Sequence, residues 1–308
     1  MQMCNAQALF LMIKKIAFFK KALSLSAFFV YVVLISTLII VASSFNNNAN
    51  AGTCSPSRVL GSFEKATVKW VYDGDTVLLT DKRKVRIIGI DTPEVKHHKQ
   101  SGQAYGAKAR EALRELLKKH KYRVLLKFGS EKKDRYKRLL AHVYLPDKTN
   151  VSTWLLEKGF AKTLSIPPNI KLADCYKQSE RVAQRQSLKI WRLKKNQLKN
   201  INALSSRFKG YVRLQGKVHD VKVSRKTRVI ELDSGSGSPI VIKIRKKHLK
   251  YFKQFSFNKL IDRKINVTGM IKKRRKKRIL YLSHPSQLEI IPINRVKPTI
   301  KWSLKNEG

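Results

Sequence analysis

The chain has 308 residues, of which 66 are Lys or Arg and only 20 are Asp or Glu, so its formal net charge is +46. A charge this far from neutral exceeds what solubility requires and indicates a polyanionic partner, with nucleic acid first and an acidic membrane or cell-wall polymer second. Disorder alone does not explain the composition, because hydrophobic residues make up 43% of the chain and aromatic residues 9%. The length suggests two domains.

Residues 1–51 are typical of a targeting segment. They contain no acidic residue, and four lysines precede a largely apolar stretch at 22–45. This order, followed by the small residues of Ala49-Asn50-Ala51, predicts a secretory signal that exports the rest of the chain to the periplasm or outside the cell. Because the apolar stretch is long enough to cross a bilayer, an uncleaved membrane anchor with the remainder outside the cytosol is the alternative.

Export also bears on the cysteines. Cys54 and Cys175 follow the targeting segment, and two cysteines in an oxidising compartment predict a disulfide between them. The alternative is a pair of buried free thiols. Without clustered histidines the cysteines do not indicate a zinc site, and we expect the adjacent His97 and His98 to be solvated loop residues.

The first folded region is predicted at 62–191. Its β-rich runs, separated by turn residues, predict strands at 68–72, 76–79, 84–90, 123–128 and 138–145. Small and apolar residues at helical spacing predict helices at 103–120, 153–158 and 172–186. Five strands with helices, but without β-α-β alternation in the first half, predict an α+β fold built on a small barrel.

A second folded region is predicted at 210–291, after a basic linker at 192–209 and before a tail at 292–308. Its apolar runs predict five strands at 211–214, 228–232, 240–244, 265–271 and 278–282. This pattern predicts a small, mainly β, OB-like barrel. Residues 211–308 contain 26 Lys or Arg against 6 Asp or Glu, so we expect this domain to bind nucleic acid, with the basic run 272–278 as a hairpin turn against phosphates.

Acidic residues gather in one place. Residues 73–94 hold five of the 20 acids: Asp73, Asp75, Asp81, Asp91 and Glu94. Asp81 fits a hairpin turn. The others flank strands that could pair, and converging carboxylates repel one another unless a cation lies among them, which indicates Ca²⁺ or Mg²⁺. The alternative is ordinary turn chemistry, because Asp-Gly-Asp is also a good turn sequence.

Three blocks follow one another in a specific order: Tyr72-Asp73-Gly74-Asp75-Thr76, then Arg86 with Asp91-Thr92-Pro93-Glu94, then Asp134-Arg135-Tyr136-Lys137-Arg138. Together they resemble the thermonuclease (staphylococcal-nuclease-like) family, over about residues 66–191. The resemblance implies an OB-fold barrel and a Ca²⁺-dependent nuclease that hydrolyses DNA, with RNA as an open alternative. No protein partner can be inferred.

The resemblance also implies roles for the acids. Asp75 and Asp91 match calcium carboxylates, and Thr92 matches the residue whose backbone carbonyl binds the metal. Glu94 matches the general base that activates water, and Asp73 matches a supporting acid. A carboxylate near an arginine and a calcium ion stays ionised, which suits a base that must accept a proton.

The arginines have matching roles. Arg86 and Arg138 match the two arginines on the scissile phosphate, and Arg135 and Tyr136 match positions near the terminal phosphate of the nucleotide. Guanidinium groups remain charged and bind phosphate oxygens in pairs, so they suit the charge that develops during attack on a phosphodiester. In a chain with 66 basic residues, the alternative for any one arginine is a solvated surface group.

Three positions depart from the family pattern. Lys137 stands where the family usually has Gly, and Ser165 and Pro167 stand where its prototype has two tyrosines. These departures keep open a second hypothesis, a non-catalytic nucleic-acid-binding protein on a nuclease scaffold. A third hypothesis, a membrane-anchored protein that binds acidic polymers, leaves the acids unexplained.

Overall fold

The computed structural model describes residues 54, 62–96, 101–205, 207–234, 239–274 and 277–292. All of them lie in one compact unit, residues 51–308. The predicted signal or anchor, its cleavage site, His97, His98 and the tail from residue 293 onward lie outside the described residues. No helix among those described is long and apolar enough to span a membrane.

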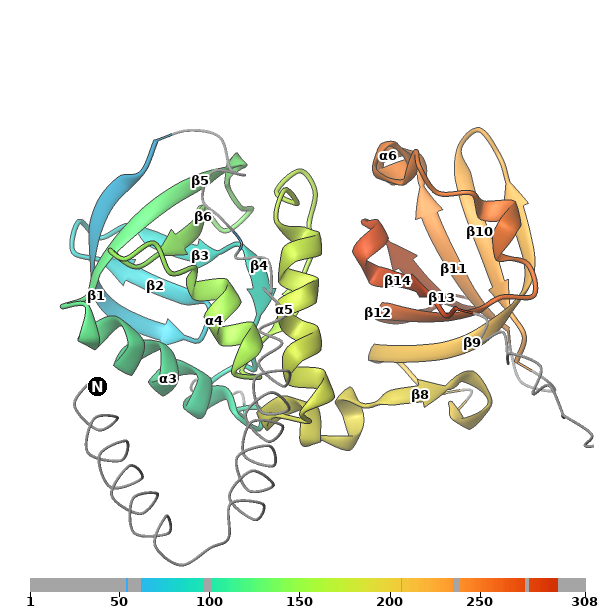
Figure 1. The fold of residues 1–308 in the computed structure, drawn as a ribbon, viewed down its shortest axis with the longest axis horizontal. Coiled ribbons are helices and arrows are strands. Elements are labelled where there is room, and N and C mark those ends of the chain that lie inside the picture. The colour runs from blue at the N-terminus through green and yellow to red at the C-terminus, as the bar shows by residue number, and fades with distance from the viewer. Residues whose placement is uncertain are drawn as a thin grey trace, which may run out of the picture. The chain divides into compact units, whose positions relative to one another are not determined.

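Five strands of the first region close into a barrel in the order β1-β2-β3-β6-β5 (Figure 1). They are β1 (Glu64–Asp73), β2 (Thr76–Leu79), β3 (Lys84–Ile87), β5 (Arg123–Lys133) and β6 (Leu139–Tyr144). All neighbours are antiparallel except β3 and β6. Alternate residues such as Val77, Leu79, Val85 and Ile87 are buried and fill the interior. The predicted α+β fold with a five-stranded barrel is confirmed.

Three helices accompany the barrel: α3 (Gly106–Lys119), α4 (Val151–Glu157) and α5 (Ala173–Arg185). In α3 the residues Ala109, Leu113, Leu116 and Leu117 are buried, at the spacing of one helix face. The structure also joins Cys54 to Cys175 of α5 by a disulfide, with the two Cα atoms 5.6 Å apart. The helix therefore holds the chain that precedes β1.

The strand predicted at 84–90 is interrupted. Ile88 separates β3 from β4 (Gly89–Asp91), which pairs with β7 (Lys162–Leu164) instead of continuing in the barrel. Gly89 has φ +90°, and a Cβ atom there would lie 2.1 Å from the Tyr176 ring. Only glycine fits this position without strain, and the break directs β4 away from the barrel wall.

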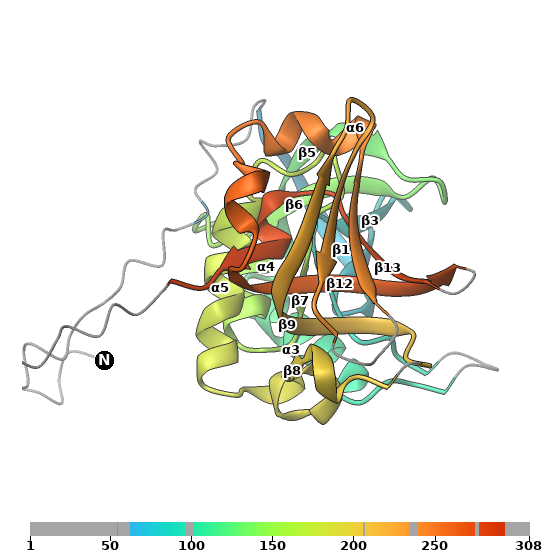
Figure 2. The same cartoon turned by 90° about the vertical axis from the view of Figure 1, so that its right-hand side faces the viewer.

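The second region is a barrel-like sheet with the same strand order as the first (Figure 2). It contains β9 (Gly210–Val223), β10 (Thr227–Leu232), β11 (Ile240–Arg245), β12 (Lys264–Arg274) and β13 (Lys277–Leu282). They pair in the ring β9-β10-β11-β13-β12-β9, in which only β11 and β13 are parallel. The prediction of a small, mainly β domain is confirmed, and its OB-like class stays a prediction that this order supports.

Short elements complete this region. The sheet gains β8 (Leu198–Asn200) and β14 (Leu288–Ile290) at its edges. Among the described residues, one short helix, α6 (Lys246–Leu249), follows β11. The 3-10 turns η2 (Lys189–Arg192) and η3 (Lys194–Asn196) precede β8, and η4 (Ile201–Ala203), η5 (Lys250–Phe252), η6 (Phe257–Leu260) and η7 (Pro285–Gln287) follow it in the chain. The segment predicted as a linker, 192–209, thus carries β8, which runs parallel to β9.

The two β regions contact each other. Arg213 of β9 donates from Nη2 to Gln184 Oε1 at 2.8 Å, and its guanidinium lies 5.3 Å from the Trp191 ring centre. Ser283 Oγ donates to the Ser165 carbonyl at 2.9 Å. The second region is therefore joined to the first through side chains as well as through the connecting segment.

Candidate active site

A cleft of about 390 Å³ opens where β3 passes into β4. The residues that line it include Arg86, Gly89, Asp134, Tyr136, Arg138 and Ile166. Lining residues from three separate stretches of the chain, 86–90, 131–140 and 164–169, thus face one volume, with guanidinium, carboxylate and aromatic groups among them. The cleft brings Arg86 of the second sequence block together with Asp134, Arg135, Tyr136 and Arg138 of the third, whereas Asp91, Thr92 and Glu94 are not among its lining residues.

Asp75 lies behind this cleft and is only 5% exposed. Its Oδ2 accepts hydrogen bonds from Thr92 N at 2.8 Å and Thr92 Oγ1 at 3.1 Å, and its Oδ1 accepts from Thr76 Oγ1 at 3.1 Å. Asp73 Oδ1 accepts from Asp75 N at 3.0 Å, which closes the turn between β1 and β2. Burial raises the pKa of Asp75 to about 6, and Arg86 opposes this rise.

One guanidinium contacts both predicted metal carboxylates. Arg86 Nη1 lies 2.9 Å from Asp75 Oδ1, and Nη2 lies 3.4 Å from Asp91 Oδ1. The Arg86 side chain is 13% exposed, whereas that of Asp91, at the end of β4, is 51% exposed. Desolvation raises the pKa of Asp91, with Arg86 acting in the opposite direction. The two acids therefore converge, as the sequence predicted, and Arg86 neutralises part of their charge.

The donors present suit a hard cation better than a soft one. Within the part of the chain that the structure describes, no three His, Cys, Asp or Glu residues gather as a metal cage. Two carboxylates, of Asp75 and Asp91, do converge beside the buried Thr92. Oxygen donors of this kind suit Ca²⁺, which takes six to eight oxygens, so substrate and water oxygens would have to complete the shell.

Glu94 is exposed and follows β4 in the chain segment that leads to α3, between the buried residues Pro93 and Val95. Its backbone carbonyl accepts a hydrogen bond from Gln103 N at 2.9 Å. The first residue of α3, Gly106, passes so close that a Cβ atom there would lie 2.2 Å from the same carbonyl oxygen. The start of α3 therefore fixes the backbone of the predicted general base.

Asp134 holds Arg138 in place. Its Oδ2 accepts from Arg138 Nε at 2.7 Å, and its Oδ1 accepts from the backbone amides of Arg138 at 3.0 Å and Tyr136 at 2.9 Å. Partial burial opposes ionisation, but the hydrogen bonds from Arg138 and Tyr136 lower the pKa of Asp134. Lys137, at the tip of this turn, has φ 63°. The turn forms with Lys in the left-handed conformation and still brings Arg138 to the cleft.

Arg135 and Tyr136 form the outer edge of the cleft. Arg135 Nη2 donates to Tyr136 Oη at 2.6 Å, and the guanidinium lies 4.7 Å from the ring centre. Tyr136 is 63% exposed. An exposed aromatic ring with a stacked cation is well suited to contact a nucleotide and its phosphate.

The sequence prediction assigned no role to Asp134 and Lys162, two side chains that interact with predicted site residues. Asp134 belongs to the third sequence block. An Asp four residues before an Arg in a turn is the pattern from which its contact with Arg138 could have been predicted. Lys162 belongs to β7, which the sequence did not reveal; its Nζ lies 4.0 Å from the Tyr211 ring centre. Burial lowers the pKa of Lys162, and Asp91 acts against this effect, so Lys162 contributes positive charge next to Asp91.

The other two departures from the family pattern are Ser165 and Pro167, which flank the cleft residue Ile166. Ser165 does not supply an aromatic ring, and its hydroxyl lies 3.3 Å from Ser286 Oγ of the second β region. Pro167, the other departure, is followed by Pro168 and likewise supplies no aromatic ring. This stretch, next to Ile166 of the cleft, therefore contacts the second region.

Comparison with known proteins gives consistent matches. Residues 84–193 match the family model described as staphylococcal nuclease homologue. A thermonuclease of Staphylococcus intermedius is 37% identical over 166 residues, which cover 52% of this chain and 95% of that protein. The SPbeta prophage-derived endonuclease YokF of Bacillus subtilis (strain 168) is 36% identical over 129 residues, 41% of this chain and 43% of its own length. Endonuclease YncB of the same strain is 34% identical over 129 residues and is covered over 60% of its length.

Proposed function

We propose that this chain, which belongs to the family of staphylococcal nuclease homologues, is an exported Ca²⁺-dependent enzyme that cleaves DNA and also accepts RNA. Membership of the family makes it a nuclease, a hydrolase of phosphodiester bonds. The proposed catalytic mechanism rests on one observation. Arg86 and Arg138 line one cleft, and each is held by carboxylates while its side chain stays 13% and 27% exposed, respectively.

In the proposed mechanism the chain's own residues bind the phosphate and move one proton. Arg86 and Arg138 bind the phosphoryl oxygens of the scissile group. Glu94 removes a proton from the water that attacks phosphorus, the bond to the leaving oxygen breaks, and that oxygen takes up a proton. Negative charge grows on the phosphoryl oxygens during attack, and guanidinium groups already oriented by Asp75, Asp91 and Asp134 stabilise it without reorganisation.

Calcium is the proposed cofactor. Asp75, Asp91 and the carbonyl of Thr92 would hold it. When bound, a calcium ion would supply a Lewis acid for a phosphate oxygen and a template for the water. Asp73 supports this site by fixing the turn that carries Asp75, and Arg135 and Tyr136 bind the neighbouring phosphate.

Export is proposed from two separate observations. The basic and then apolar order of residues 1–51 is that of a secretory signal. The disulfide between Cys54 and Cys175 fits an oxidising compartment. If the signal is not cleaved, residues 22–45 would anchor the protein to the membrane with the nuclease outside the cytosol, and cell fractionation would separate these two cases.

The test is a digestion of plasmid DNA and of RNA by the purified protein in Ca²⁺, in Mg²⁺ and in EDTA. The test variant is Asp91→Asn, and its matched control is Asp147→Asn, an exposed turn acid away from the cleft. We expect cutting in calcium, no cutting in EDTA, and a calcium requirement raised about tenfold or more in Asp91→Asn. The control should behave like the wild type.

Two results would contradict this proposal. Cutting in EDTA would remove calcium from the mechanism. Salt-sensitive binding without any cutting would instead support the non-catalytic alternative, which Lys137 and Ser165 keep open.

A further inference from the structure

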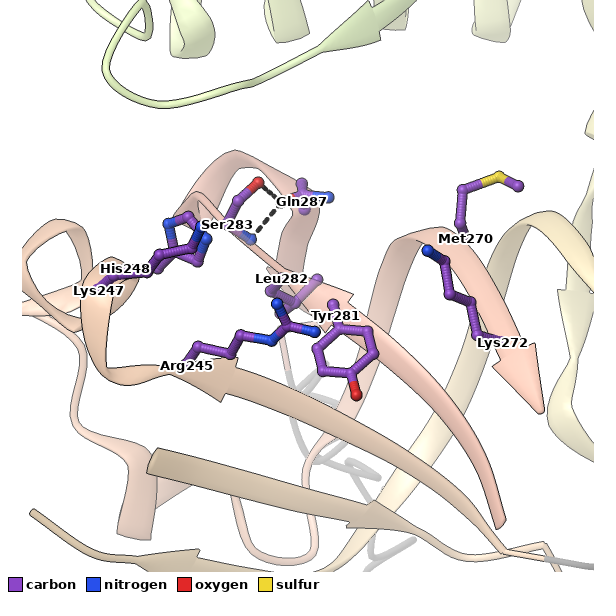
Figure 3. A pocket seen from close by; sticks show the side chains of 9 residues that line it. All are labelled: Arg245, Lys247, His248, Met270, Lys272, Tyr281, Leu282, Ser283 and Gln287. Atoms are coloured by element: carbon purple, nitrogen blue, oxygen red, sulfur yellow. Dashed lines mark hydrogen bonds between the residues drawn. The ribbon is translucent and has the colours of Figure 1, made fainter. Parts of the chain in front are cut away.

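A second pocket lies on the C-terminal sheet, away from the catalytic groups (Figure 3). It has a volume of about 280 Å³. Its walls come from the end of β11, the start of α6, the middle of β12 and the end of β13, and include Arg245, Lys247, Met270, Lys272, Tyr281 and Ser283. The pocket has room for one nucleotide base.

The charge of this pocket is entirely positive. Arg245, Lys247 and Lys272 line it together with His248, and among the residues that the structure describes no acidic side chain lines it. Burial lowers the pKa of His248, and the cations Lys247 and Arg245 lower it further, as expected where like charges crowd. A group that neutralises this charge must be an anion, and a phosphate fits the exposed Lys and Arg side chains.

The pocket also offers an aromatic and apolar surface. The Arg245 guanidinium lies 4.3 Å from the centre of the Tyr281 ring, and Figure 3 shows the two side chains facing each other. Met270 on β12 is 52% exposed although its side chain is apolar. A flat ring with a stacked cation and an exposed thioether is a surface on which a base can stack.

A hydrogen bond joins a residue of this pocket to the chain that lines the catalytic cleft. Ser283, which lines the pocket, donates from Oγ to the carbonyl of Ser165 at 2.9 Å. The next residue, Ile166, lines the catalytic cleft and is 58% exposed. Ser165 therefore lies between Ile166 of the cleft and Ser283 of the second pocket.

We propose that this pocket is a second nucleotide-binding site, which takes one unstacked base and its phosphate from a single strand that also occupies the catalytic cleft. The base stacks on the Arg245–Tyr281 pair and on Met270, and Lys247 and Lys272 bind the phosphate. Duplex DNA keeps its bases stacked and paired, so the site selects single-stranded substrate. This inference rests on the proposed nuclease function for the strand's path and on the pocket itself for the binding.

The experiment measures binding of a fluorescent 20-nucleotide oligo(dT) by anisotropy in EDTA, where no cutting occurs. The test variants are Tyr281→Leu, which keeps an apolar side chain but loses the ring, and Arg245→Gln. The matched control is Arg225→Gln, which removes one exposed charge from the turn between β9 and β10. We expect each test variant to weaken binding about tenfold, and the control about twofold or less.

Further measurements make the outcomes distinct. Thermal melting of each variant shows whether it folds, and Lys272→Gln, at an exposed position on the pocket wall, repeats the test without touching the ring. Equal losses for a 20-base-pair duplex and for oligo(dT) would overturn the single-strand site. Losses confined to binding of anionic lipid vesicles would reassign the pocket to a membrane.

Hydrolysis of a dinucleotide in calcium separates this inference from the proposed function. A dinucleotide is too short to fill both sites, so Tyr281→Leu should leave its rate unchanged. If the wild type cuts the dinucleotide and Tyr281→Leu binds oligo(dT) normally, the second site is wrong and the nuclease stands. If binding depends on Tyr281 but nothing is cut in calcium, the nuclease is wrong and the second site stands.

Discussion

Arg86 illustrates how the site is organised at the scale of single residues. Its two terminal nitrogens contact Asp75 and Asp91, and Asp75 is in turn fixed by Thr92. A guanidinium held from one side by two carboxylates keeps its orientation before substrate arrives, which lowers the reorganisation needed when charge develops. The same logic applies to Arg138, which Asp134 holds by its side chain and its backbone.

Lys137 is the residue at which a departure from the family pattern can be tested. The left-handed conformation costs a residue with a Cβ atom about 1–2 kcal/mol, and the added freedom of glycine in the unfolded chain offsets part of this. We therefore expect Lys137→Gly to raise the free energy of unfolding by about 0.5–1 kcal/mol in urea denaturation, with little change in cleavage rate because Arg138 is already paired.

Lys148 provides the matched control for this prediction, because it has φ 66° in a turn outside the cleft lining. Lys148→Gly should gain the same stability. A rate increase in Lys137→Gly that Lys148→Gly lacks would show that Lys137 displaces Arg138. A loss of stability in Lys137→Gly would contradict the backbone argument.

His142 predicts a dependence of stability on pH. It is 2% exposed, and its Nδ1 lies 2.7 Å from Tyr176 Oη. Burial lowers its pKa to about 4, and the positive charge of Lys127 contributes. In the unfolded chain the imidazole of His142 is protonated as the pH falls through 6.5, whereas in the folded protein it stays neutral until about pH 4. The contribution of neutral His142 to the free energy of unfolding is therefore fully present above pH 6.5. It is lost, by on the order of 3 kcal/mol, as the pH drops to 4.

The measurement is urea denaturation of the wild type and of His142→Gln at several pH values between 4 and 7. All other groups titrate in both proteins and cancel in the difference. We expect a flatter slope in the variant, and parallel curves would rule out a neutral buried His142.

At the scale of elements, the break between β3 and β4 and the start of α3 position the segment that carries Glu94. Gly89 allows β4 to leave the barrel wall, and Gly106 lets α3 approach the carbonyl of Glu94. Gly106→Ala would place a methyl group where that oxygen lies, so the loop must shift. We expect kcat to fall by about tenfold or more with a smaller change in KM, because small displacements of catalytic groups are costly.

Gly216→Ala in the second region is the control, since its Cβ would meet the flexible end of Leu232 at 3.2 Å and the Ile201 side chain at 3.4 Å, both far milder contacts than at Gly106. It should keep the wild-type rate. A normal rate in Gly106→Ala, in a protein that melts normally, would mean that α3 does not position Glu94.

Sequence patterns predicted these elements unevenly, for physical reasons. Strands with alternating burial, such as β2 and β3, follow directly from period-two hydrophobicity. Sequence periodicity missed β7 and β14, because each has three residues and depends on a partner strand for its pairing. The acid pair of Asp75 and Asp91 was predictable from composition and resemblance, whereas the link between Ser165 and Ser283 depends on tertiary contacts, which no local pattern encodes.

At the scale of the whole molecule, the 308-residue chain that forms these two sheets has a formal net charge of +46. A long-range field of this size attracts nucleic acid before any specific contact forms. We expect binding of oligo(dT) in EDTA to weaken about tenfold or more between 50 and 200 mM salt, because each neutralised phosphate releases counterions. Affinity that does not change with salt would show that charge plays little part in binding.

The most direct test of the central claim is the rate of calcium-dependent cleavage of a defined oligonucleotide by Glu94→Gln. Glu115→Gln, an exposed acid on α3, is the matched control. If Glu94 is the general base, its variant should cut about 10²–10³-fold more slowly while binding the oligonucleotide normally in EDTA. A Glu94→Gln protein that cuts at the wild-type rate would contradict the mechanism.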